Sequence, residues 1–152
     1  MFSKIPFINV LFQDILRKVN FEDVQIAIKS RDKFLIINTL SVGEQDCLIQ
    51  GTLSFDMEEK IINEMLTEYN TSEKTIVIYG KNTNDASADN RCKQLMKLGF
   101  QKVFIYQGGM FEWLLLQDIY GHKEFPTTKK ILDILKYKPH QTFHNRMLTY
   151  GS

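Results

Sequence analysis

The sequence predicts an α/β fold in which a central, mostly parallel sheet has helices on both faces. Residues 75–80 form a short apolar run led by Thr, Ile and Val, which is typical of a buried parallel strand. Similar apolar runs occur at residues 33–39 and 102–106, and segments with helical spacing separate the runs. Strands that alternate with helices form βαβ units, so these runs are expected to pair in parallel.

The chain before the first of these strands is expected to be helical. Pro6 suits a first helical turn, and the apolar residues after it recur at helical spacing, which predicts a helix over residues 6–18. Asn20 is followed by two acidic residues, a pattern that predicts a capped helix ending near Lys29. The strand at residues 33–39 follows.

The middle of the chain holds a second helix and the helix that follows the central strand. Residues 51–53 are expected to add a short strand, and Asp56 is expected to cap an amphipathic helix that runs to about residue 69. After the central strand and a polar loop, residues 88–98 are predicted to form a helix that ends at Gly99.

The last predicted elements leave an apolar surface that needs a cover. Gly108 and Gly109 lead into a helix over residues 110–120, which is apolar nearly all round. The N-terminal helix, the C-terminal extension or another subunit could cover it, and we expect the cover to come from the same chain. A short helix is predicted at residues 128–135, and residues 136–152 are expected to form a tail.

Composition favours a single domain and gives no support for a polyanionic partner. The chain has 152 residues and a formal net charge of +1, so bulk charge predicts neither nucleic acid nor an anionic membrane as a partner. No apolar run reaches the roughly 18–20 residues of a membrane-spanning helix. The predicted domain, residues 1–152, has a helical extension at 1–20, a core at 21–120 and a C-terminal extension at 121–152.

The cysteine content indicates a reducing compartment. The chain has only Cys47 and Cys92, which cannot form a disulfide framework, and we expect a cytoplasmic protein. Cys92 has the spacing of a buried helix face and is expected to be packed rather than reactive. Cys47 precedes Gly51 in a predicted loop, a position compatible with exposure, and no base or cation at a readable spacing would activate it.

Several segments resemble the rhodanese-like domain family. Residues 98–113 read LGFQKVFIYQGGMFEW, which is similar to the closing signature of the family, with Gly-Phe, a strand, Gly-Gly and a Trp. Residues 36–40 (IINTL) and 48–51 (LIQG) resemble the first signature and the segment after it. Residues 76–79 resemble the strand that leads into the active-site loop. The resemblance covers about residues 21–116 and implies a rhodanese-like fold. The whole chain also faintly resembles rhodanese-like proteins of large DNA viruses.

The resemblance implies a catalytic cysteine that this chain lacks. Active members carry the nucleophilic Cys directly after the Tyr of the strand, and Gly80 stands at that position. The loop is about one residue longer than the common sulfurtransferase loop, and Ala86 replaces the Arg that often precedes the Ser. Asn38 and Leu40 replace the acidic and basic residues of the first signature, and Gln50 replaces a Pro. The predicted degenerate loop comprises Gly80, Lys81, Asn82, Thr83, Asn84, Asp85, Ala86 and Ser87.

Two interpretations of this loop stay open. Lys81, the polar side chains and the backbone amides could form a pocket that weakly binds an anion, since a loop entering a helix N-terminus attracts negative charge. A cysteine introduced at position 80 would then have a depressed pKa. Alternatively, the loop is solvated, and Ser87 or Asp85 only caps the helix.

The leading functional hypothesis is a catalytically inactive rhodanese-like domain that binds or scaffolds a protein partner, as a monomer or homodimer. The alternative is a sulfurtransferase or phosphatase-type enzyme that uses a displaced thiol. His140 and His144 are four residues apart, but no further ligand completes a metal set. We expect no metal and no cofactor.

Overall fold

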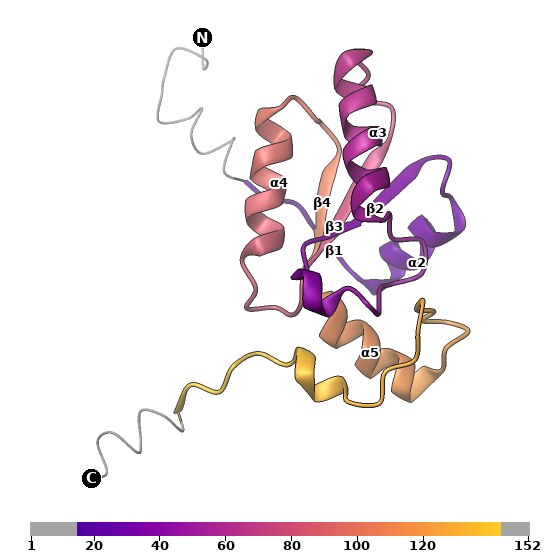
Figure 1. Ribbon diagram of the computed structural model, residues 1–152, viewed down its shortest axis with the longest axis vertical. Helices are drawn as coiled ribbons and strands as arrows, with labels where there is room; N and C mark the ends of the chain where they lie inside the picture. The colour runs from indigo at the N-terminus through magenta and orange to yellow at the C-terminus, as the bar shows by residue number, and fades with distance from the viewer. Residues whose placement is uncertain (1–14, 144–152) are drawn as a thin grey trace.

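A computed structural model describes residues 15–143. Its centre is a parallel sheet of four strands in the order β1-β4-β3-β2 (Figure 1). The strands are β1 (Lys18–Val19), β2 (Phe34–Asn38), β3 (Thr75–Tyr79) and β4 (Val103–Tyr106). In the registers, Phe34 pairs with Thr75 and Ile76 pairs with Val103. The predicted α/β class and its parallel strands are therefore confirmed.

Helices cover both faces of the sheet. They are α2 (Phe21–Lys29), α3 (Phe55–Thr67), α4 (Ser87–Lys97) and α5 (Gly109–Tyr120), with short 3-10 turns at η2 (Val42–Glu44) and η3 (Ile134–Tyr137). One apolar core joins the sheet to α2, α5 and η3, and a second core joins it to α3 and α4 (Figure 1). The strands alternate between the two cores, as the side-chain period of two requires: Val77 and Tyr79 face the first, and Ile76 and Ile78 face the second.

Local sequence signals fix most helix ends. Asn20 and Asp23 form a reciprocal capping box at the start of α2, as the sequence predicts. Gly99 follows α4 with a φ of 106°, the left-handed conformation expected of a terminating glycine. The predicted cap of α3 is wrong, because Ser54 rather than Asp56 accepts the N–H of Met57. Asp56 lies within the first turn, where its charge still favours the helix.

Three other predicted elements differ in the structure. Lys18 belongs to an edge strand and not to a helix, while residues 6–14 of the predicted helix lie outside the described residues. Residues 51–53 form only an isolated bridge, between Thr52 and Ile36. The predicted helix at residues 128–135 is wrong, since its only helical piece is the start of η3.

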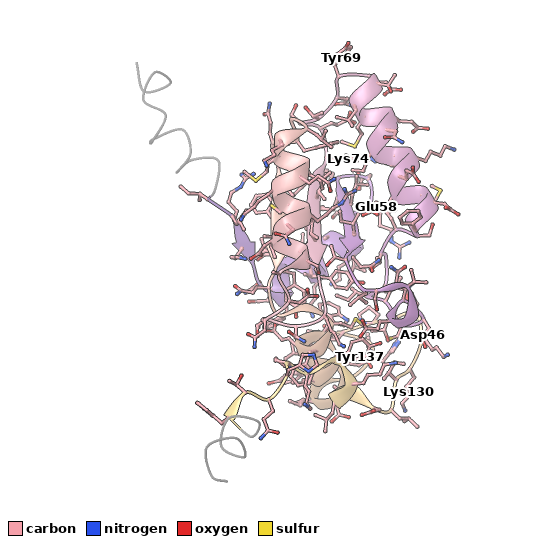
Figure 2. All side chains as sticks on the ribbon, turned by 60° about the vertical axis from the view of Figure 1, so that its left-hand side comes forward. Asp46, Glu58, Tyr69, Lys74, Lys130 and Tyr137 are labelled. Atoms are coloured by element: carbon pink, nitrogen blue, oxygen red, sulfur yellow. The ribbon has the colours of Figure 1, made fainter. Side chains whose placement is uncertain are left out.

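The C-terminal extension packs on the core and is not a tail in its described part. Tyr137 is completely buried in the core against α5. Figure 2 shows Tyr137 at the α5 end of the molecule, with Tyr69 at the opposite end. The indole of Trp113 donates to the carbonyl of Pro126, and its ring centroid lies 5.0 Å from that of Phe125. The extension therefore covers α5, which confirms that the cover comes from the same chain.

The exposed part of α5 is confined to its far side and its end. Leu115 is 39 % exposed and Ile119 is 69 % exposed. Within residues 15–143, no helix is both long and apolar enough to cross a membrane.

Candidate functional site

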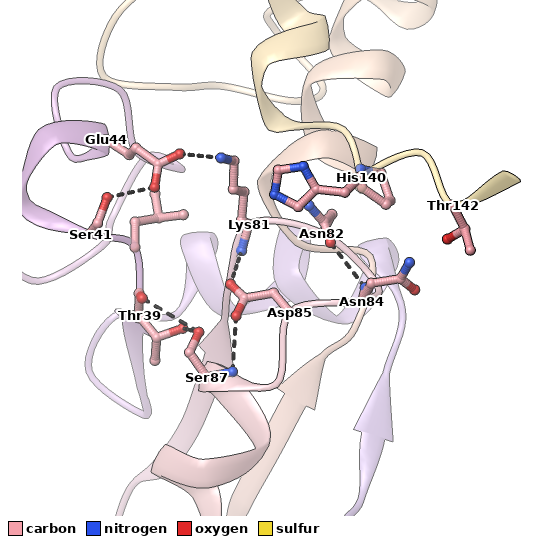
Figure 3. Close-up of a pocket in the computed structure, with 12 residues that line it drawn as sticks. Thr39, Ser41, Glu44, Lys81, Asn82, Asn84, Asp85, Ser87, His140 and Thr142 are labelled. Carbon is pink, nitrogen blue, oxygen red and sulfur yellow. Dashed lines mark hydrogen bonds and ion pairs between the residues drawn. The ribbon is translucent and has the colours of Figure 1, made fainter. Parts of the chain in front are cut away.

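A pocket lies where β3 ends and α4 begins, at the loop that the sequence singles out. Its volume is about 490 Å³, and it opens at the carboxyl edge of the sheet, where helix N-termini converge (Figure 3). The predicted loop contributes Lys81, Asn82, Asn84, Asp85 and Ser87 to its walls. The other lining residues come from the segment after β2 and from the C-terminal extension, and they are Thr39, Leu40, Ser41, Glu44, Pro139, His140 and Thr142.

The carboxylate of Asp85 fills the centre of the loop. Its Oδ2 accepts the backbone N–H of Lys81 at 2.9 Å, and its Oδ1 accepts that of Ser87 at 3.0 Å (Figure 3). A Cβ atom at Gly80 would lie only 2.7 Å from the same Oδ2. Burial opposes ionisation of the Asp85 carboxyl, but the hydrogen bonds from these two amides outweigh it and hold its pKa below the ordinary value. Asp85 therefore accepts an N–H at the start of α4, as one of the two interpretations predicts, although the N-cap residue itself is Ala86, whose side chain makes no cap hydrogen bond.

Asn82 orders the rest of the loop. Its side-chain oxygen accepts the N–H of Asn84 at 3.0 Å, and its carbonyl accepts the N–H of Asp85 at 3.2 Å. Its side-chain amide donates to the carbonyl of Tyr137 at 2.9 Å. Asn82 is therefore a buried link between the loop and the C-terminal extension and not a free polar group of the pocket.

The N-terminus of α5 is hydrogen-bonded to the start of the loop. The N–H groups of Met110 and Phe111 donate to the carbonyls of Gly80 and Lys81, at 3.0 and 2.9 Å. Gly109 permits this approach, because it has a φ of 67° and its Cβ would lie 2.7 Å from the carbonyl oxygen of Gly80. Gly109 thus sets the distance between α5 and the loop.

The first residues after β2 form another wall of the pocket. The hydroxyls of Thr39 and Ser87 lie 2.6 Å apart, which ties this segment to the first residue of α4. Asn38 turns inward and accepts the N–H of Leu40 at 3.0 Å, and Leu40 is buried in the core. Asn38 and Leu40, which replace the acidic and basic residues of the signature, thus form a local turn and part of the core and of the pocket wall.

The one loop cation is neutralised within the pocket. The ammonium of Lys81 lies 2.6 Å from Glu44 Oε2, and Ser41 donates to the other carboxylate oxygen at 2.6 Å. The bonds from Lys81 and then Ser41 lower the pKa of Glu44. Lys81 is therefore directed toward a carboxylate partner and away from the amides of the loop.

The comparison with protein families identifies the architecture. The family model described as rhodanese-like domain matches residues 21–116. The chain belongs to the rhodanese-like domain family. Gly80 thus occupies the position that the resemblance assigns to the nucleophile, and Ala86 the position of the basic residue before the Ser.

Solved structures show the same fold at low sequence identity. The Alr3790 protein from Anabaena is 19 % identical, with a TM-score of 0.53, and the match covers 78 % of this chain and 97 % of that one. The BH2092 protein from Bacillus halodurans is 20 % identical, with a TM-score of 0.52 and coverage of 74 % and 80 %. Ygr203w from Saccharomyces cerevisiae, described as a homolog of single-domain rhodanese, is 10 % identical, with a TM-score of 0.55 and coverage of 78 % and 91 %. No curated protein matches the sequence.

Both thiols of this rhodanese-like chain are buried. Cys47 is completely buried, although its position in a predicted loop is compatible with exposure. Its thiol donates to the carbonyl of Lys129 at 3.1 Å. Cys92 is also completely buried, as the sequence predicts, 3.7 Å from the sulfur of Met96. Burial raises the pKa of both thiols, which disfavours the reactive thiolate.

Only one residue of the predicted His140–His144 pair lies in the part of the chain that the structure describes. His140 lines the rim of the pocket, while His144 lies outside the described residues. Among residues 15–143, no group of three or more His, Cys, Asp and Glu side chains is arranged to hold a metal ion.

Two features of the site escape sequence reasoning. The family signatures locate the loop but do not reveal that Asp85 reaches the space above Gly80. The only available signal is the Asx-type pattern of an Asp two residues before a helical N–H. Pro139, His140 and Thr142 reach the pocket because Tyr137 is buried, and the irregular sequence after Pro126 gives no sign of this.

Proposed function

We propose that this protein is a catalytically inactive rhodanese-like domain that acts as a protein-binding or scaffolding module. The observation that carries the proposal is that position 80 holds a glycine, with the carboxylate of Asp85 beside it. Gly80 offers no atom that can attack a sulfur or phosphorus centre, and Asp85 takes the amides that would stabilise a negatively charged intermediate. The chain keeps the fold and the pocket while it lacks the reacting group.

The proposed partner is a protein that binds across the mouth of the pocket. Three separate segments form this concave polar surface, which suits recognition of a shaped partner better than of a uniform polyanion. The balanced net charge supports a neutral or mixed partner. We propose that the module works in the cytoplasm as a monomer or homodimer, without nucleic acid, membrane or cofactor.

A second candidate function is an enzyme that uses a displaced or borrowed thiol. The fold permits such chemistry, since the Ygr203w structure is also described as a yeast protein tyrosine phosphatase of the rhodanese family. Both cysteines of this chain are buried, so Cys47 would need a conformational opening before it could react. A thiol from a partner protein would need the pocket to be free of Asp85.

The first prediction is the absence of turnover. We expect no thiocyanate from thiosulfate and cyanide, and no phosphatase activity, above a heat-inactivated control, because loss of the attacking group typically costs many powers of ten in rate. Cys47→Ser and Cys92→Ser variants are measured in parallel. Turnover by the native chain that one of these variants abolishes would overturn the proposal and favour the second candidate.

A binding experiment tests the pocket as the interaction surface. Asn84 and Asn90 are both exposed, but only Asn84 lines the pocket. Asn84→Arg should reduce capture of a partner from the native source, whereas Asn90→Arg should leave it unchanged. Equal capture by the two variants would exclude the pocket mouth as the binding surface.

A further inference from the structure

We propose that Asp85 is an internal ligand of the degenerate loop. Its carboxylate occupies the space of a side chain at position 80 and the amides that would otherwise receive an external oxyanion. Gly80 is the matching residue, because only a residue without a side chain leaves room for this carboxylate. The loop is therefore closed to sulfate, phosphate and related oxyanions while Asp85 stays in place, whether or not a protein partner binds.

A side chain at position 80 would collide with the carboxylate of Asp85. A Cβ atom at position 80 would lie 2.7 Å from Asp85 Oδ2, 3.2 Å from Asp85 Cγ and 3.2 Å from the hydroxyl of Thr39. The first distance is well below a normal van der Waals contact, so the carboxylate and a side chain at position 80 exclude each other.

Asp85 also occupies two hydrogen-bond donors of the loop. Asp85 engages the N–H groups of Lys81 and Ser87 through its two separate oxygens. These donors lie at opposite ends of the loop, one after β3 and one at the start of α4. A single carboxylate thus bridges the loop in the manner of a bound anion, and the lowered pKa of Asp85 shows that its charged form is the favoured one.

Hydrogen bonds to neighbouring elements keep the loop from widening to hold both groups. Met110 and Phe111 hydrogen-bond to the carbonyls of Gly80 and Lys81 from α5, and Thr39 hydrogen-bonds to Ser87 on the opposite wall. Asn82 is anchored to Tyr137. A side chain at position 80 must therefore displace Asp85 rather than push the backbone apart.

This arrangement revises the sequence-based expectation for Gly80→Cys. In that single variant the thiol competes with the carboxylate of Asp85 for the same space and the same amides, and the nearby negative charge disfavours the thiolate. In Gly80→Cys/Asp85→Ala the freed amides of Lys81 and Ser87 and the N-terminus of α4 can stabilise it. The thiol at position 80 should thus have a lowered pKa only when Asp85 is also replaced.

The test is the pH dependence of iodoacetamide alkylation. We expect the double variant to alkylate with a pKa about one unit or more below that of Gly80→Cys, which is roughly tenfold more thiolate at a pH below both values. Gly43→Cys is the matched control, because nothing lies within 4 Å of a Cβ there, and its thiol should titrate near 8.5. The native chain, with two buried cysteines, sets the background rate.

A titration with inorganic phosphate tests the same claim without a new thiol. The amide resonances of Lys81 and Ser87 should shift saturably in Asp85→Ala and should not shift in the native chain. If Asp85→Ala does not fold, Asp85→Ser replaces it in both experiments, because Ser can still cap α4 but is too short to reach the space above Gly80.

Three outcomes would overturn the proposal. A thiol in Gly80→Cys that titrates as low as in the double variant would show that Asp85 does not obstruct the loop. Ordinary titration in both variants would show that the amides do not converge on position 80. Equal phosphate binding by the native chain and the Asp85 variant would show that the carboxylate is not a competing ligand.

Discussion

At the scale of single residues, Gly109 sets the position of the loop on the fold. Its left-handed backbone places the first amides of α5 against the carbonyls of Gly80 and Lys81, and its missing Cβ leaves room for the carbonyl oxygen of Gly80. Gly99 also has a positive φ, of 106°, but has open space around it. A substitution at Gly99 therefore introduces backbone strain alone, whereas one at Gly109 introduces backbone strain and a steric clash.

We predict that Gly109→Ala destabilises the fold more than Gly99→Ala. The left-handed conformation costs roughly 1–2 kcal/mol at either position. The clash with the Gly80 carbonyl adds a further ~1–3 kcal/mol at position 109 only. Urea unfolding with unchanged m-values provides the comparison. Equal losses of stability would show that α5 can withdraw from the loop without cost.

At the scale of elements, the sequence predicts those parts that local signals specify. The capping box of α2, the apolar run of β3 and the glycine after α4 all act within a few residues, so a single sequence reveals them. Strand β1 has only two residues, and it exists because its backbone pairs with a strand more than eighty residues away. No periodicity can reveal such an element.

The candidate site divides in the same way. The position of the loop, the missing nucleophile at Gly80 and the buried Cys92 follow from the sequence. The hydrogen bonds of the Asp85 carboxylate lie within the loop, where the Asx-type spacing is their only sequence signal. The burial of Tyr137 depends on how the C-terminal extension folds back on the loop, which residue spacing does not encode.

A prediction at this scale concerns the edge of the sheet. We expect a chain that lacks residues 1–19 to self-associate more than one that lacks residues 1–14, because only the former loses β1 and exposes the edge of β4. β1 is held by the bond from the Ile105 N–H to the Arg17 carbonyl and by the Lys18–Asp89 ion pair at 2.8 Å. Sedimentation velocity compares the two truncations. Equal monomer fractions would show that β1 does not protect this edge.

At the scale of the whole molecule, one core unites the site, α5 and the C-terminal extension. Tyr79, Tyr106 and Tyr137 all lie in it. Tyr79 hydrogen-bonds to Thr52 and Ile49, and Tyr106 donates to Glu112, but the Tyr137 hydroxyl has no partner among the described residues. Burial raises the pKa of all three phenols, that of Tyr137 to about 12, with smaller contributions there from Cys47 and two acidic side chains.

These shifts predict a loss of stability at alkaline pH. A phenol whose pKa is higher in the folded chain than in the unfolded chain stabilises the fold fully below the unfolded value of about 10. Above it the unfolded chain releases the proton first, so the free energy of unfolding should fall by about 1.4 kcal/mol per pH unit for each such tyrosine. For Tyr137 this window extends from about pH 10 to about 12.

Tyr137→Phe measures how much the tyrosine of the C-terminal extension contributes to this alkaline loss of stability. Below pH 10 the variant should be as stable as the native chain or slightly more stable, because it removes a buried hydroxyl without a partner. Between pH 10 and 12 its unfolding free energy should fall less steeply, by about 1.4 kcal/mol per pH unit. Tyr69→Phe, at a side chain that is 94 % exposed, is the control and should follow the native curve. Parallel curves for the native chain and Tyr137→Phe would mean that Tyr137 is already exposed to water in the folded protein, and that the extension does not seal this core.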